Sequence, residues 1–106
     1  MVFVNMKTIT CAEFNVLKDG SGEYIILDVR NPGEFKRGHM EDAVLIPLHV
    51  LPLRYVEKFP DKEQHIVCCC ATGGRASLAT TFLISQGYTN VSVLEGGYKG
   101  YCEQQI

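Results

Sequence analysis

Residues 65–75, His-Ile-Val-Cys-Cys-Cys-Ala-Thr-Gly-Gly-Arg, decide the fold of this chain. The apolar run over 65–70 predicts a strand buried on both faces, and the segment from Arg75 to Gln86 has the apolar spacing of a helix. Cys70 therefore stands where a strand gives way to a tight turn and a helix N-terminus. Backbone N–H groups of such a turn form an anion-binding nest, and a helix N-terminus favours negative charge. A thiol at the mouth of this turn is stabilised as thiolate, its nucleophilic form.

The segments on either side alternate between strand and helix patterns. Upstream, the sequence predicts a helix after the capping pair Thr10 and Glu13, strands over 24–29 and 43–46, one helical turn begun by Pro32, and a helix within 49–59. This last helix rests on the spacing of Val50, Leu53 and Val56, with Pro52 confining its regular part to the residues that follow. Downstream, the helix over 75–86 stops at Gly87, and a strand over 90–94 and a closing helix over 98–105 follow.

Strands separated by helices in this order indicate an α/β fold, a central parallel sheet of about four to five strands with helices on both faces. Ligands of such sheets bind beyond the carboxyl ends of the strands, and Asp28 and Cys70 both lie at such ends. With 106 residues, 46% of them hydrophobic and 21% charged, the whole chain 1–106 is expected to be one globular domain.

The composition also limits the classes of partner that we expect for this chain. The net charge of −2 and the scattered Lys and Arg residues give no reason to expect nucleic acid. No apolar stretch is long enough for a membrane span, and residues 1–7 lack the pattern of a signal peptide, so we expect a cytoplasmic protein without a membrane partner. A monomer is the default, since no obvious dimer surface is evident.

The five cysteines are Cys11, Cys68, Cys69, Cys70 and Cys102. An odd number with three in a row is not a disulfide framework and fits a reducing compartment. A metal site is disfavoured, because neighbouring strand residues point to opposite faces and no spaced partner pair lies nearby. We therefore expect neither a metal nor an organic cofactor.

Three segments together resemble the rhodanese family of single-domain sulfurtransferases. They are residues 27–35 (LDVRNPGEF), 38–47 (GHMEDAVLIP) and 70–75 (CATGGR), and the Leu-Glu-Gly-Gly run at 94–97 also falls at family spacing. The chain departs from the family pattern in four places. It lacks the basic residue that often follows the active cysteine and the serine that often follows the loop arginine. The turn at Glu41-Asp42 also differs, and the tryptophan after the Gly-Gly pair is missing, with Tyr101 a candidate to fill its place.

The resemblance implies a rhodanese-like fold and transfer of a sulfane sulfur through a persulfide on Cys70, from a donor to a thiol or cyanide acceptor. The loop that would hold the anion consists of Ala71, Thr72, Gly73, Gly74 and Arg75. The donor stays open among thiosulfate, a low-molecular-weight persulfide and a persulfide carrier protein. Ala71 weakens the case for thiosulfate, the donor that defines a thiosulfate sulfurtransferase, because it removes a cation from the rim.

Supporting roles follow for other residues of these segments. Asp28 and Arg30 are expected to form a structural ion pair or loop brace, and His39 a hydrogen-bonded scaffold. Glu34 is expected to pair with a nearby cation or a backbone N–H. For Arg75, two roles stay open, donation to the loop carbonyls and contact with an anionic substrate.

Counting from Cys69 gives a second interpretation of the loop. Cys69 and Arg75 form a C-x5-R loop, the length used by phosphatases and arsenate reductases of the same fold, whereas Cys70 gives the shorter C-x4-R. The spacing to Gly87 and the lack of a histidine before Cys69 favour Cys70. A thiol redox sensor in which Cys68 resolves oxidised Cys70 is a further alternative. A non-catalytic docking module is disfavoured by the presence of the cysteine.

Overall fold

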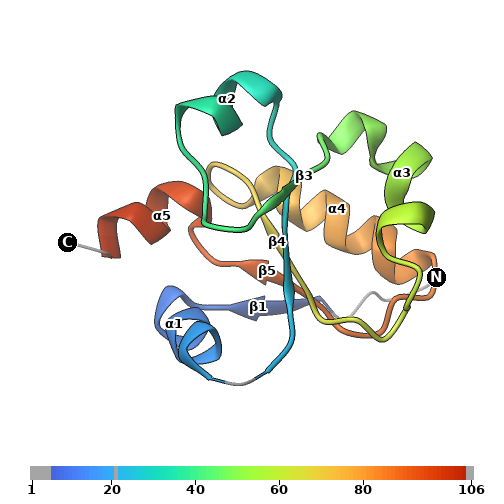
Figure 1. Ribbon diagram of the computed structural model, residues 1–106, viewed down its shortest axis with the longest axis horizontal. Helices are drawn as coiled ribbons and strands as arrows, with labels where there is room; N and C mark the ends of the chain where they lie inside the picture. Colours follow the sequence, from blue (N-terminus) through green and yellow to red (C-terminus); the bar gives the residue numbers. More distant parts are fainter. Residues whose placement is uncertain (1–5, 21, 105–106) are drawn as a thin grey trace.

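The computed structural model describes residues 6–20 and 22–104, and in them five parallel strands form one sheet in the order β1-β5-β4-β2-β3 (Figure 1). The strands are β1 (Lys7–Ile9), β2 (Ile25–Asp28), β3 (Val44–Leu45), β4 (Ile66–Cys69) and β5 (Val91–Leu94). The helices are α1 (Cys11–Asp19), α2 (Pro32–Arg37), α3 (Leu51–Lys58), α4 (Gly74–Ser85) and α5 (Gly97–Gln104), with a 3-10 turn at Leu48–Val50. The α/β architecture with a parallel sheet is confirmed.

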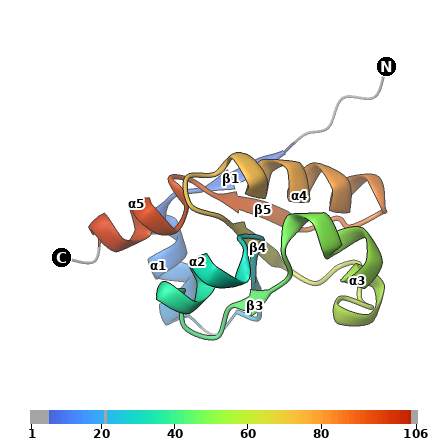
Figure 2. The same ribbon diagram turned by 90° about the horizontal axis from the view of Figure 1, so that it is seen from above.

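Helices cover both faces of the sheet (Figure 2). On one face, α3 and α4 bury a core that includes Leu27, Phe59 and Leu83. On the other, α1 and α5 pack over a core that includes Phe14 and Leu94. Side chains of a strand alternate between the two faces of the sheet, and helices cover both faces. Strand β4 is therefore buried at all four positions, as its continuous apolar run predicts. No helix in the described part of the chain is long and apolar enough to cross a membrane.

Two short helices begin at capping boxes. At α1, the Thr10 hydroxyl accepts from the Glu13 N–H, and the Glu13 carboxylate accepts from the Thr10 N–H, so the predicted capping pair is confirmed. At α2, Asn31 and Glu34 make the same reciprocal pair, with Pro32 at the first helical position. Both caps satisfy backbone donors that a helix start leaves unpaired.

Two parts of the fold differ from the sequence-based expectation. Strand β1 was not predicted; its three residues are too few for a periodic pattern, and pairing with β5 makes it a strand. Helix α3 begins before Pro52, which its first turn accommodates, because the N–H that proline lacks has no partner there in any case. Leu53 and Val56, whose spacing predicted this helix, are 82% and 64% exposed. Other residues of α3 and the segment after it make the core contacts, Leu51, Tyr55 and Phe59.

The parallel arrangement brings the carboxyl ends of the strands to one edge. Strands β2 and β4 pair side by side, with Asp28 opposite Cys69. Helix α2 and the loop over 70–73 follow directly from these ends and lie beyond them (Figure 1). The edge where a parallel sheet binds its ligands thus contains the segments that the sequence singled out.

Candidate active site

The sulfur of Cys70 lies inside the turn between β4 and α4. The Gly73 N–H donates to Cys70 Sγ over 3.0 Å, and the Ala76 N–H donates over 3.4 Å. Gly73 has φ +119°, a conformation that a residue with a side chain rarely adopts, so a glycine is needed where the loop turns its N–H inward. Two N–H donors, one of them in the first turn of α4, stabilise negative charge on this sulfur. The predicted nest around Cys70 is present.

The position of the sulfur differs from the expectation in one respect. Cys70 is only 1% exposed, so its sulfur is buried under the loop and does not lie at the mouth of the turn. The side chain packs in the same core as Cys68, on the face that α4 covers. Above it, Thr72 and Gly74 are exposed, and Ala71 and Gly73 are half-buried. The rim of the loop is therefore formed by uncharged residues.

The neighbouring thiols lie in different surroundings. Cys69 packs on the opposite face of the sheet, its Sγ donates to the Cys70 carbonyl oxygen over 3.5 Å, and burial is the main cause that raises the pKa of its thiol. Cys68 is fully buried, and burial raises the pKa of its thiol to about 12. Cys68 and Cys69 therefore stay protonated at neutral pH, and the loop geometry favours Cys70 as the nucleophile.

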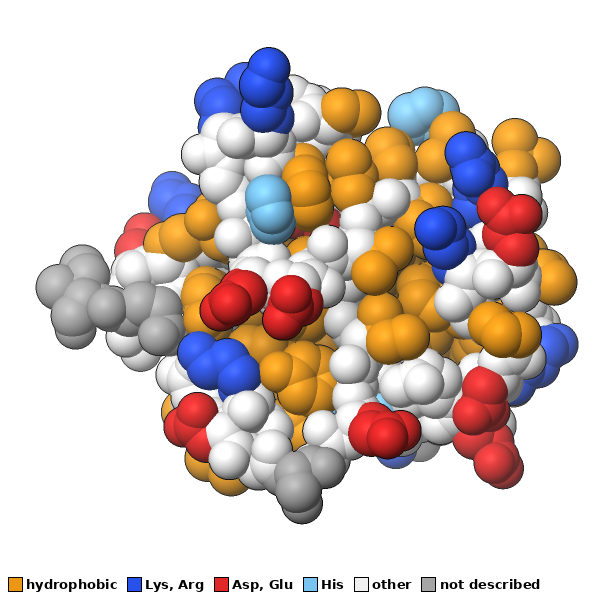
Figure 3. All heavy atoms as spheres, viewed as in Figure 1, with side chains coloured by type: hydrophobic (Ala, Val, Ile, Leu, Met, Phe, Trp, Pro, Cys, Tyr) orange, Lys and Arg blue, Asp and Glu red, His pale blue; other side chains and the backbone are white. Residues whose placement is uncertain are grey.

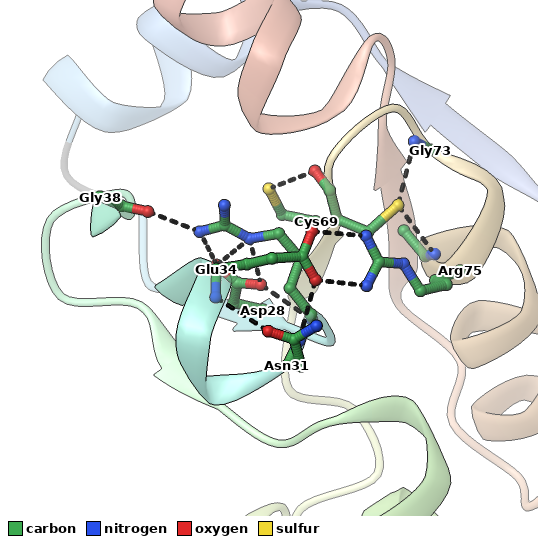
Figure 4. A network of polar contacts seen from close by, with 10 residues as sticks. Asp28, Asn31, Glu34, Gly38, Cys69, Gly73 and Arg75 are labelled. Atoms are coloured by element: carbon green, nitrogen blue, oxygen red, sulfur yellow. Dashed lines mark hydrogen bonds and ion pairs between the residues drawn. The ribbon is translucent and has the colours of Figure 1, made fainter. Parts of the chain in front are cut away.

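Arg30 and Asp28 form the expected ion pair, with both side chains buried. Arg30 Nη2 lies 2.8 Å from Asp28 Oδ2, and its Nε donates to the same carboxylate. Arg30 also donates to the Gly38 carbonyl oxygen over 2.8 Å, and its guanidinium lies 4.6 Å from the centre of the Tyr98 ring. The pair therefore connects the end of β2 with the turn after α2 (Figure 4). Through the Tyr98 ring it also contacts α5, and these contacts fit a bracing role.

Glu34 and Arg75 join α2 to the first turn of α4. Arg75 Nη1 donates to Glu34 Oε1 over 2.7 Å and Nη2 donates to Oε2 over 2.9 Å, a bidentate pair (Figure 4). Hydrogen bonds from Arg75 are the main reason that the pKa of Glu34 falls to about 2. The expected cationic partner of Glu34 is thus Arg75. Neither role left open for Arg75 describes this geometry, because its guanidinium is taken up by a carboxylate.

His39 makes a hydrogen bond of the kind expected for a scaffold residue. Its Nδ1 is hydrogen-bonded to the Phe35 carbonyl oxygen at 2.8 Å, and the two rings stack with their centres 3.7 Å apart. These contacts close the turn that follows α2. Within residues 6–20 and 22–104, no group of three His, Cys, Asp or Glu side chains is arranged to hold a metal ion.

A pocket of about 260 Å³ lies beside Arg75 at the same edge of the sheet. On the face seen in Figure 3, apolar side chains gather between α2 and α3, the two helices that flank this region. No site role was predicted for the segment over 47–49, although Pro47 ends the family-like segment over 38–47 and His49 begins the predicted helical segment over 49–59. The pocket is lined by Val29, Arg30, Asn31, Pro47, Leu48, His49 and Arg75.

The fold and this loop together define a class, small parallel α/β proteins with a cysteine held in an anion-binding turn at the carboxyl edge of the sheet. The family described as rhodanese-like domain matches residues 11–104, and the chain belongs to this family. A sulfurtransferase of Allochromatium vinosum is 36% identical over 75 residues, which are 71% of this chain and 68% of that protein. The crystal structure of a rhodanese-like domain protein from Staphylococcus aureus has a TM-score of 0.83 at 29% identity and covers 91% of both chains.

Relatives of this domain also include larger proteins with another activity. The tRNA uridine(34) hydroxylase of Erwinia tasmaniensis is 33% identical over 97 residues, or 88% of this chain. The matched part is only 27% of that hydroxylase. Family membership therefore supports a rhodanese-type enzyme, and the reaction must be argued from the site itself.

Proposed function

We propose that the protein transfers a sulfane sulfur from a donor to an acceptor through a persulfide on Cys70. The observation that supports this most directly is the pair of N–H donors, from Gly73 and Ala76, that point at Cys70 Sγ. Donors aimed at one sulfur stabilise a thiolate before the reaction and an anionic persulfide during it. The chain belongs to a family with sulfurtransferase members, which agrees with this chemistry.

The reaction has two balanced steps. In the first, the Cys70 thiolate attacks the outer sulfur of the donor; a bond from Cys70 Sγ to this sulfur forms, and the bond to the rest of the donor breaks. With thiosulfate the leaving group is sulfite, and with a persulfide it is a thiolate. In the second step, the thiolate form of an acceptor thiol, or cyanide, attacks the outer sulfur and forms a bond to it. The bond from this sulfur to Cys70 Sγ breaks, the product is a new persulfide or thiocyanate, and the Cys70 thiolate leaves with its electron pair.

We propose a persulfide, rather than thiosulfate, as the preferred donor. Thiosulfate is a dianion and needs positive charge beside the cysteine, but the exposed and half-buried rim residues Ala71 and Thr72 are uncharged. The nearest loop cation, Arg75, is neutralised by Glu34. A protonated persulfide carries no charge on the sulfur that is transferred, so it avoids the cost of bringing unpaired negative charge into the loop.

Intact-mass spectrometry tests the proposal. Reduced protein is mixed separately with thiosulfate and with glutathione persulfide, and the Cys70→Ser and Cys69→Ser variants are treated in parallel. We expect a gain of one sulfur atom that cyanide discharges, that is lost only in Cys70→Ser, and that forms faster with the persulfide. No gain with either donor contradicts the transfer, and an equal or faster reaction with thiosulfate contradicts only the donor preference.

The same variants examine the phosphatase or arsenate reductase alternative. That alternative needs Cys69 as the nucleophile, yet Cys69 Sγ lies on the other face of the sheet and donates to a carbonyl. Turnover of a phosphate ester or arsenate that is lost in Cys69→Ser would overturn the assignment to Cys70. A redox sensor would instead form a stable disulfide under peroxide and show no sulfur turnover.

A further inference from the structure

The N-terminus of α5 makes direct contact with the thiol loop. The Tyr98 N–H donates to the Cys70 carbonyl oxygen over 2.7 Å, and the Lys99 N–H donates to the Ala71 carbonyl oxygen over 3.1 Å. The first N–H groups of a helix have no partner within it, so these donors are available at no cost to α5. Helix α5 therefore binds two successive carbonyls of the loop that holds the sulfur.

These contacts affect which way the loop faces. A peptide plane that turns its carbonyl outward turns its N–H inward, because the two point in opposite directions. At the other end of the loop, the Gly73 carbonyl accepts from the Ser77 N–H and hydroxyl, each over 2.9 Å, at the start of α4. The carbonyls of Cys70 and Ala71 share their peptide planes with the N–H groups of Ala71 and Thr72. Helix α5 therefore fixes the backbone that leads directly into Gly73, whose N–H donates to Cys70 Sγ over 3.0 Å.

Gly97 lies where α5 leaves no room for a side chain against the loop. It is buried, with φ +63°. A Cβ at this position would stand 2.5 Å from the Cys70 carbonyl oxygen and 2.6 Å from the Ala71 carbonyl oxygen, closer than such atoms can approach. The obstacle is backbone, so a side chain at 97 must push α5 away from the loop.

We propose that Gly97 is a positioning residue for sulfur transfer: its missing side chain lets the N-terminus of α5 hold the carbonyls of Cys70 and Ala71, and so keeps the backbone before Gly73 in the conformation that directs the Gly73 N–H to the sulfur. The inference adds to the proposed function a residue outside the loop, more than twenty positions further along the chain. It concerns the anion-holding geometry, whichever donor supplies the sulfur.

Gly96 provides a matched control. It also has a left-handed backbone, with φ +80°, but a Cβ there would meet only the Cα of Gly100, at the ordinary contact distance of 3.5 Å. Gly96→Ala and Gly97→Ala thus impose a similar backbone strain on the same turn. Only Gly97→Ala displaces the loop.

The experiment measures the pH at which the Cys70 thiolate is half formed, from the ultraviolet thiolate absorbance that Cys70→Ser removes. In Gly97→Ala we expect this pH to rise by about one unit, the effect of one weakened charge-assisted hydrogen bond. At a pH below the half-titration points of both proteins, persulfide formation should slow about tenfold, since the thiolate population there falls in proportion. In Gly96→Ala both values should stay those of the parent protein.

A folded Gly97→Ala protein with the parent's titration overturns the inference, and so does a shift of equal size in Gly96→Ala. If Gly97→Ala does not fold, Lys99→Pro replaces it, because proline is accepted in a first helical turn and removes the N–H that binds the Ala71 carbonyl. Lys99→Ala is the control for loss of the lysine side chain. If the half-titration pH rises in Lys99→Pro but not in Lys99→Ala, the result supports the inference. If it does not rise in Lys99→Pro, the result contradicts the inference. If the parent protein forms no persulfide, the proposed function is wrong, whereas the titration still decides the role of Gly97.

Discussion

The bridge between Glu34 and Arg75 allows a sharp test, the substitution Glu34→Gln. The glutamine keeps the size of the side chain and an oxygen that can accept from the Asn31 N–H, so the capping box of α2 survives. What it removes is the negative charge that accepts the two hydrogen bonds from Arg75. The substitution therefore isolates the charge of this bridge from the cap and the packing around it.

The size of the effect follows from the pKa of Glu34. A fall from the ordinary value of 4.5 to about 2 corresponds, taken in full, to about 3 kcal/mol of folding free energy. The side chains of Arg75 and Glu34 are 37% and 20% exposed, so water and salt screen part of this interaction. We therefore expect Glu34→Gln to lower the free energy of unfolding by about 1–2 kcal/mol near neutral pH.

The direction of the pKa shift of Glu34 fixes how its contribution to stability changes with pH. Because the pKa of Glu34 is lower in the folded than in the unfolded protein, its stabilisation is complete above about pH 4.5 and is lost as the pH falls toward about 2. Urea denaturation of the parent protein and of Glu34→Gln, near neutral pH and at intervals down through this window, measures the difference directly. The two stabilities should converge toward the acid end.

Glu57→Gln provides the control, since Glu57 pairs with Arg54 on an exposed helix surface, where both side chains are more than half exposed. We expect it to change the free energy of unfolding by less than about 0.5 kcal/mol. The reasoning is refuted if Glu34→Gln is as stable as the parent near neutral pH, or if the difference between them does not shrink as the pH falls.

Three further substitutions test the rest of the fold. Asp28→Asn leaves the buried Arg30 guanidinium without its carboxylate, and we expect urea denaturation to show a loss of about 3–5 kcal/mol, with a loss below 1 kcal/mol contradicting the bracing role. Thr10→Ala removes the hydroxyl that caps α1 and should cost about 1 kcal/mol by the same assay, whereas an unchanged midpoint would show that the cap is not needed. Leu53→Ser should change stability by less than about 0.5 kcal/mol, because the side chain is largely exposed, and a large loss would place it in a buried contact.

Much of the site could be predicted because its parts are close in sequence. The Asp28–Arg30 pair spans two residues, the capping box of α1 spans three, and the turn from Cys70 to Ala76 spans six. Contacts of this kind depend on local backbone geometry, which the residue types themselves favour. For the same reason the order of strands and helices could be predicted, since apolar spacing is a local signal.

Contacts between distant segments could not be predicted in this way. Arg75 is 41 residues from Glu34, and nothing in its own segment distinguished this partner from a loop carbonyl or a substrate. Strand β1 exists through its pairing with β5, and the exposure of Leu53 depends on how α3 is rotated on the sheet. Each of these outcomes follows from the packing of whole elements.

The sequence alone thus determined the α/β class, the parallel direction of the strands and the cysteine that follows β4. It could do so because repeating apolar patterns and turn residues act over a few positions. Only the tertiary structure decided that the Cys70 sulfur is buried, that Arg75 is occupied by Glu34, and that α5 rests on the thiol loop. The physical reason is that these contacts form when the parallel sheet brings separate chain segments to one edge, where close packing, and not residue type, selects the neighbours.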